Sequence, residues 1–208
     1  MAWADAATPA VGDADNGGWA NHTIRQLLSD SLLSHGGETH VRVTFYASSA
    51  EAFSIGKAYI GLAHDAASDW YDFGETPTQL LFDGGSADFD IAAGESKVSD
   101  MLEFSFDDTK DLLISFWVKN NAATDGLRRD TAITSWYYYY KAGGDDAATV
   151  NATGYTEASS SAIGVFKIES IVISGPAGVK SVNEILTANI KSVNEINLAD
   201  IKALQGLT

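Results

Sequence analysis

The sequence predicts an all-β protein, an antiparallel jelly-roll-like β-sandwich with a short C-terminal repeat tail. Short runs of alternating apolar and polar residues recur along the chain, and turn sequences separate them about every eight to twelve residues. Helical periodicity is missing between about residue 35 and the tail, which leaves no room for the crossover helices of a parallel α/β fold. We therefore divide the chain into an N-terminal arm (1–22), a sandwich domain (23–175) and the tail (176–208).

A period of two in the side chains predicts the individual strands. In residues 40–46, Val41, Val43 and Phe45 alternate with more polar neighbours, so one apolar face points inward. Residues 23–33 fit either a short helix or a first strand, and we favour the strand. Further strands are predicted over 55–63, 78–82, 88–93, 97–106, 111–119, 132–141 and 164–173.

Segments 97–106 and 111–119 are predicted to pair with each other as an antiparallel hairpin. The polar run 107–110 between them is typical of a turn. The residues expected to share an apolar face are Val98, Leu102, Phe104 and Phe106 in the first segment, and Leu112, Ile114, Phe116 and Val118 in the second.

The composition excludes several classes of function. Hydrophobic residues make up 45% of the chain and aromatic residues 11%, which is enough for one large core. The formal net charge of −15 disfavours binding to nucleic acid or to anionic lipid. The chain has no cysteine, which excludes disulfides and thiolate metal sites. No apolar run approaches the roughly 20 residues of a membrane-spanning helix.

Catalytic and targeting motifs are missing from the sequence. It has no G-x-S-x-G, phosphate-binding loop, dinucleotide fingerprint or H-E-x-x-H, and its 28 acidic residues make any carboxylate pair uninformative. The four histidines, none in a recognisable catalytic context, are His22, His35, His40 and His64. The first residues lack the basic and apolar regions of a secretory signal peptide. We expect a protein that is made in a cytosol and is not an enzyme.

A calcium site is one candidate, near the N-terminus. Asp13, Asp15 and Asn16 place oxygen ligands before Gly17, as at the start of a calcium-binding loop. The glutamate expected later in an EF-hand is missing, and a plain acidic turn is the alternative interpretation. No other cofactor is expected.

Two aromatic clusters are stronger candidates for a binding site. In the run 136–140, a strand would place Trp136, Tyr138 and Tyr140 on one face and the other two tyrosines on the opposite face. Trp70, Tyr71 and Phe73 form the second cluster, in a loop-like stretch, and Trp70 and Tyr71 are its candidate binding residues. Exposed Trp and Tyr beside acidic residues suit sugar recognition and suit protein interfaces equally well. The alternative is that both clusters belong to the core.

The tail is an internal repeat of eleven residues. Residues 179–189 align with 190–200 and with the partial unit 201–208. Each unit is too short to bury its own apolar residues, which predicts a docking or oligomerisation segment, with a strap over its own domain as the alternative. The period of eleven fits either a right-handed helical coil or short strands with turns, and a trimer, which we favour, would suit the strands. The apolar positions are Val179, Val182, Ile185, Ile190, Val193, Ile196, Ile201, Leu204 and Leu207.

Several stretches of the chain suggest a family. They are THVRVTF (39–45), KAYIG (57–61), YDFGETPTQLLFDGG (71–85), DLLISFWV (111–118) and YYYYKAGGDDAATVNATGYT (137–156). Together they resemble a β-sandwich module of tailed-phage and gene-transfer-agent virion proteins, which is itself similar to sandwiches that accompany carbohydrate-active domains. The IKSVNEI units of the tail resemble the IKSVNG-type repeats of phage structural proteins, although Glu184 and Glu195 stand where glycine is usual.

This resemblance implies a virion structural protein, either a decoration, head-fibre or tail-associated component. Its partners would be other virion proteins, further copies of itself and a host surface polysaccharide, with neither nucleic acid nor membrane among them. One alternative is a stand-alone carbohydrate-binding module of a secreted bacterial enzyme. A small hydrolase with an unrecognised site is another.

Overall fold

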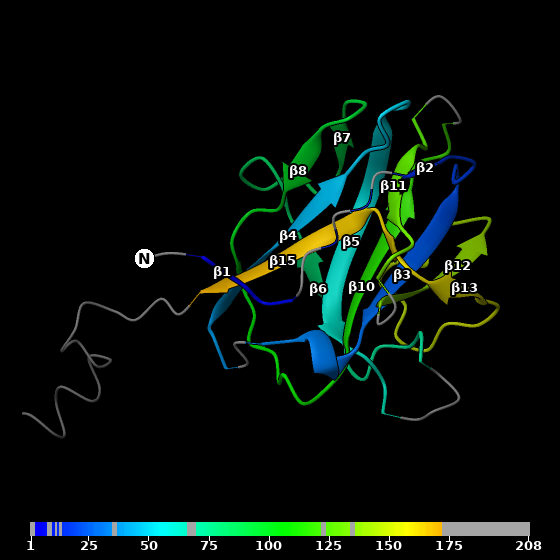
Figure 1. Cartoon of the computed structure of the whole chain (residues 1–208). Helices are drawn as coiled ribbons and strands as arrows, with labels where there is room; N and C mark the ends of the chain where they lie inside the picture. The colour runs from blue at the N-terminus through cyan, green and yellow to red at the C-terminus, as the bar shows by residue number, and fades with distance from the viewer. Residues whose placement is uncertain are drawn as a thin grey trace, which may run out of the picture. The chain divides into compact units, whose positions relative to one another are not determined.

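The computed structural model describes residues 3–7, 10, 12, 14–34, 37–65, 70–121, 124–133 and 136–171 (Figure 1). The chain divides into two compact units, Met1–Val172 and Ile173–Thr208, and every described residue belongs to the first. The predicted repeat tail, with its apolar positions from Val179 to Leu207, therefore lies outside the described residues.

Strands make up nearly all of the regular structure in the described residues. A 3-10 turn, η1 (Asp30–Leu32), is the exception. The strands are β1 (Ala4–Asp5), β2 (Ala14–Asn16), β3 (His22–Leu28), β4 (His40–Tyr46), β5 (Phe53–Leu62), β6 (Thr78–Leu80), β7 (Phe89–Ile91), β8 (Ser96–Val98), β9 (Leu102–Glu103), β10 (Leu112–Val118), β11 (Leu127–Asp130), β12 (Trp136–Ala142), β13 (Thr156–Ser160), β14 (Ala162–Ile163) and β15 (Val165–Ile171). None of the described helices is long and apolar enough to cross a bilayer.

The strands form two main antiparallel sheets. Counted over the described residues, the larger sheet has seven strands in the order β13-β12-β3-β10-β5-β6, with β7 also paired to β5. The smaller sheet has the order β1-β15-β4-β8, with β9 also paired to β4, and a third sheet joins β14, β11 and β2. Figure 1 shows β4 and β15 forming one layer and β5, β10 and β3 the other. This arrangement confirms an antiparallel β-sandwich; the jelly-roll form of it stays a prediction.

The core lies between the two main sheets and follows the predicted alternation. In β10, Leu112, Ile114, Phe116 and Val118 are all fully buried. Across the core, the ring of Phe116 meets that of Phe45 from β4 edge to face, with 5.5 Å between centroids. Each such side chain contributes about 1.5–3 kcal/mol through its removal from water.

The predicted hairpin between 97–106 and 111–119 is wrong. The turn exists, since the Lys110 amide donates to the Asp107 carbonyl oxygen at 3.1 Å. However, β8 and β9 both pair with β4 in the smaller sheet, whereas β10 pairs with β3 and β5 in the larger one. The chain therefore crosses between the sheets at this turn. Alternation identifies the inward face of a strand but not its neighbour, and β8 even leaves Val98 40% exposed.

The N-terminal segment, which the sequence predicted only as an arm, contains two short strands. β1 pairs with β15 and β2 pairs with β11, so both short strands extend existing sheets. Trp19 packs against the rest of the domain, because its ring lies 5.3 Å from that of Tyr140, edge to face. The preference for a strand over a helix at the start of 23–33 is also confirmed by β3.

Candidate aromatic groove

The outer face of the larger sheet, turned away from the core, carries a second apolar cluster. The cross-strand register places Leu113, Leu27 and Tyr137 in one row, and Ser115, Arg25 and Tyr139 in the next. Leu27 and Leu113 are as buried as core residues, and Tyr139 is only 7% exposed. Other parts of the chain must therefore cover this face, because neighbouring residues on one face of a sheet cannot bury each other. Two segments do so.

The first covering segment is residues 70–77. Phe73 packs in one cluster with Leu27 and Leu113 of the sheet and is fully buried. Gly61 in β5 makes this approach possible, because a Cβ atom there would lie 2.8 Å from Cδ1 of Phe73. The His64 amide donates to the Asp72 carbonyl oxygen at 2.8 Å, which fixes the start of the segment.

The second covering segment is residues 143–155, which connects β12 to β13. The two segments are joined directly, since the Phe73 amide donates to the Val150 carbonyl oxygen at 3.2 Å. A side-chain bond adds to this, because the Ala152 amide donates to Asp72 Oδ1 at 2.8 Å. The two segments therefore form one lid over the outer face.

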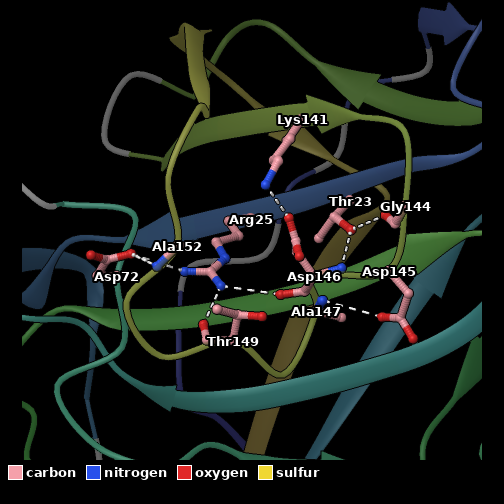
Figure 2. A network of polar contacts seen from close by, with 10 residues as sticks. All are labelled: Thr23, Arg25, Asp72, Lys141, Gly144, Asp145, Asp146, Ala147, Thr149 and Ala152. Atoms are coloured by element: carbon pink, nitrogen blue, oxygen red, sulfur yellow. Dashed lines mark hydrogen bonds and ion pairs between the residues drawn. The ribbon is translucent and has the colours of Figure 1, made fainter.

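Arg25 holds this lid from beneath (Figure 2). Its fully buried guanidinium donates to the backbone carbonyls of Tyr71 and Thr149, and to that of Asp146 at 3.2 Å. Its Nη1 also lies 3.4 Å from Asp72 Oδ1. Burial lowers the pKa of Arg25 from its ordinary value, and this shift is opposed by Tyr155 and by the nearby carboxylates. A buried arginine is stable here only because these acceptors surround it.

The Asp146 end of the second segment has its own anchors, and those that involve Thr23 and Lys141 are visible in Figure 2. Thr23 Oγ1 donates to the Gly144 carbonyl at 2.8 Å and accepts from the Asp146 amide at 3.0 Å. The Asp146 carboxylate pairs with Lys141 of β12. The neighbouring Asp145 carboxylate pairs with Lys57 Nζ of β5 at 2.8 Å. The second segment is thus tied to β3, β5 and β12.

Beside the lid is a groove of about 540 Å³, which we call the aromatic groove. Its walls are aromatic rings from the first segment, from β12 and from the end of the second segment. The stacked rings of Tyr71 and Tyr155 lie 5.3 Å apart, and Tyr71 also meets Tyr139 at 5.6 Å. The described lining consists of Leu27, Ser29, Trp70, Tyr71, Asp111, Tyr137, Tyr139, Tyr155 and Glu157.

The polar groups of the aromatic groove are acidic or neutral. Asp111 and Glu157 supply carboxylates, and Ser29 supplies a hydroxyl; the part of the lining that the structure describes contains no Lys, Arg or His. Burial raises the pKa of Tyr139 to about 12, and the negative charges of Glu157 and Asp111 add to this shift. Burial likewise raises the pKa of Tyr155 to about 12, although Arg25 beneath it acts in the opposite sense. Both phenols therefore remain neutral donors at physiological pH.

The structure separates the residues predicted to bind a ligand into two groups. Trp70 and Tyr71 line the aromatic groove, and Trp70 is 47% exposed. The predicted face of Trp136, Tyr138 and Tyr140 instead points into the sandwich: Trp136 is fully buried, Tyr138 is 4% exposed, and Tyr140 packs against the core. That part of the prediction is corrected, because β12 turns its other face toward the lid.

The residues that replace them in the aromatic groove are Tyr137 and Tyr139, together with Tyr155. The alternation of β12 already grouped the first two on a single face. Nothing in the sequence indicated Tyr155, which reaches the aromatic groove only because the second segment folds back over β3.

The predicted calcium site receives no support from the described residues. Asp15 and Asn16 belong to β2, where their backbones pair with Arg128 and Leu127, an extended arrangement unlike a calcium loop. Asp13 lies outside the described residues. No group of three or more His, Cys, Asp or Glu side chains arranged to hold a metal ion occurs in the part of the chain that the structure describes.

No protein-family model matches this chain, and no curated protein matches it significantly. The resemblance to virion proteins stays a prediction.

Proposed function

We propose that this protein is a saccharide-binding β-sandwich that acts by binding alone. The observation that supports this most is the aromatic groove itself, where five aromatic side chains and two carboxylates line one hollow of about 540 Å³. This volume lies in the range of small-molecule sites, and the open shape of a groove suits a chain of sugar rings better than a compact ligand.

The chemistry of the lining fits a sugar. The C–H faces of a pyranose pack on the flat face of an indole or phenol, and Trp70, at 47% exposure, offers such a face. Carboxylates such as Asp111 and Glu157 accept hydrogen bonds from hydroxyl groups, and the neutral phenol of Tyr139 can donate one. The lid is already fixed by Arg25, so little ordering is required when a ligand binds.

We further propose that this binding serves a virion component, as the resemblance of the sandwich and of the repeats implies. Individual sugar contacts on such a shallow surface are weak. Several copies on one particle, joined through the tail, would raise the avidity for a host polysaccharide. The protein would then be a decoration, head-fibre or tail-associated component, and a neighbouring particle protein would be its partner.

The direct test is a screen of oligosaccharides against the full-length protein, followed by titration calorimetry on each ligand that binds. We expect Trp70→Ala to weaken binding about tenfold or more, the loss of one stacked ring, while the thermal midpoint of unfolding stays unchanged. Met101→Ala is the matched control, because Met101 is also apolar and 55% exposed but does not line the aromatic groove.

Two results would contradict the proposal. One is a full screen in which no oligosaccharide binds, or in which every ligand binds the Trp70→Ala protein with the same affinity as the wild type. The other is release of new reducing ends during long incubation with a bound oligosaccharide, which would favour the hydrolase instead.

A further inference from the structure

We infer that the aromatic groove selects saccharides that carry protonated amino groups and rejects acidic saccharides. This inference rests on the proposed function and specifies the class of sugar. Two observations support it: the carboxylates of the aromatic groove have no cationic partner among the described residues, and aromatic side chains, whose faces attract cations, line the same groove.

The lysines of the described residues are all occupied elsewhere. Each one pairs with an acidic side chain that does not line the aromatic groove. The pairs are Lys57 with Asp145, Lys97 with Asp83, Lys110 with Asp65, Lys119 with Asp88 and Asp90, Lys141 with Asp146, and Lys167 with Asp5 and Glu169.

The described arginines are occupied as well. Arg25 pairs with Asp72 beneath the lid, and Arg42 pairs with Glu169 at 2.7 Å. Arg128 lies over the ring of Tyr46, and Arg129 lies over the core-facing ring of Tyr138. Glu157 and Asp111 consequently have no ion pair among the described residues, and Asp111 Oδ1 only accepts a hydrogen bond from the Asp30 amide at 2.8 Å.

Both carboxylates line the aromatic groove together with Tyr139. Their negative charges both raise the pKa of the Tyr139 phenol, which lies on its floor. An ammonium group held there would gain Coulomb attraction to two carboxylates and cation–π attraction to the ring faces of Trp70 and Tyr137. Arg25 is buried against Asp72, and Lys110 is paired with Asp65 at 3.7 Å, so both of these cations already have an acidic partner outside the groove lining.

An acidic saccharide would be repelled by the aromatic groove. Its carboxylates would face Asp111 and Glu157 without any basic side chain in the described lining to neutralise them. The net charge of −15 on the whole chain adds long-range repulsion. We expect neutral saccharides to bind with an affinity between those of the amino and the acidic saccharides.

The experiment compares three tetrasaccharides on the full-length protein by calorimetry: one of glucosamine, one of N-acetylglucosamine and one of galacturonic acid. At about pH 5.5, where Asp and Glu are ionised, we expect the glucosamine tetramer to bind about fivefold or more tightly than the N-acetylated one. We expect no measurable binding of the galacturonic acid tetramer. Raising NaCl from about 50 mM to about 500 mM should reduce the preference, because salt screens charge pairs at an exposed surface.

Variants that remove one negative charge test whether the preference for the glucosamine tetramer arises in the aromatic groove. Glu157→Gln and Asp111→Asn should each lower the ratio of the two affinities about twofold to threefold and leave the N-acetylated ligand almost unaffected. Asn at position 111 can still accept the hydrogen bond from the Asp30 amide. Glu95→Gln is the control, because it removes the same charge at an exposed position outside the aromatic groove.

The outcomes separate this inference from the proposed function. Equal or weaker binding of the glucosamine tetramer, with Trp70-dependent binding of the N-acetylated one, would overturn the inference and leave saccharide binding intact. A ratio that Glu95→Gln lowers as much as Glu157→Gln would also overturn it, because net charge alone would then explain the preference. If none of the three tetramers binds, the inference fails, and the proposed function fails with it only if the full oligosaccharide screen also yields no ligand.

Discussion

The guanidinium of Arg25 lies 3.4 Å from the carboxylate of Asp72, and both side chains are buried beneath the wall of the aromatic groove. Arg25 is on the central strand β3, whereas Asp72 is in the segment that carries Trp70 and Tyr71. The same guanidinium donates to a backbone carbonyl in each covering segment. One buried cation thus fixes the position of the lid on the sheet.

Arg25→Met should therefore destabilise the protein by about 3 kcal/mol, because it leaves a buried carboxylate without its cationic partner and several carbonyls without their donor. Urea unfolding measures the loss. The lid should also open more often, so limited proteolysis should cut within 143–155 sooner than in the wild type. Arg42→Met is the control: the Arg42 side chain is 31% exposed in its pair with Glu169, and we expect a loss of about 1 kcal/mol or less. Equal losses in the two variants would contradict the central role of Arg25.

Neighbouring tyrosines of β12 should respond in opposite ways to substitution. Tyr138→Ala removes a ring that is 4% exposed in the core and should cost about 3 kcal/mol or more of stability. Tyr137→Ala removes a half-buried ring of the aromatic groove and should cost about 1 kcal/mol, but it should weaken ligand binding several-fold. Chemical denaturation and calorimetry on the same preparations separate the two effects. A binding defect in Tyr138→Ala at temperatures where it is fully folded would argue against this division of faces.

Stability should decline in alkaline solution between about pH 10 and about pH 12. The pKa values of Tyr139 and Tyr155 are raised to about 12 in the folded protein, chiefly by burial, against 10.0 for an ordinary tyrosine. In this window the unfolded chain releases both protons while the folded protein retains them, so each tyrosine lowers the free energy of unfolding by at most about 1.4 kcal/mol per pH unit. The stabilisation is fully present below pH 10. Denaturation curves at successive pH values measure the slope, and Tyr139→Phe should flatten it; an unchanged slope would refute the assignment.

Removal of residues 179–208 should abolish self-association, because the repeats carry apolar residues that a single short unit cannot bury. Light scattering coupled to size exclusion should show a trimer for the full chain and a monomer for the truncated one. The truncated protein should retain its thermal midpoint and its affinity for a monovalent oligosaccharide, since the aromatic groove lies wholly within residues 27–157. The same assembly with and without the tail would contradict the predicted role of the repeats.

The sequence by itself determined the fold class and the position of most strands. Alternation placed 40–46 and 111–119 close to β4 and β10, because a strand that packs one face on a core must repeat its polarity every two residues. It also grouped Tyr137 with Tyr139. It gave no information about which face of β12 points inward, because both faces are aromatic.

Only the tertiary structure decided the pairing of strands and the composition of the aromatic groove. The segments 97–106 and 111–119 look like a hairpin but belong to different sheets, because a polar turn can reverse the chain within a sheet or carry it across to the other. Trp70, Tyr137 and Tyr155 come from three distant parts of the chain and meet because Arg25 binds carbonyls that sequence cannot assign to it. Local polarity indicates the buried face of a strand whose other face is polar, whereas long-range hydrogen bonds decide which segments lie together.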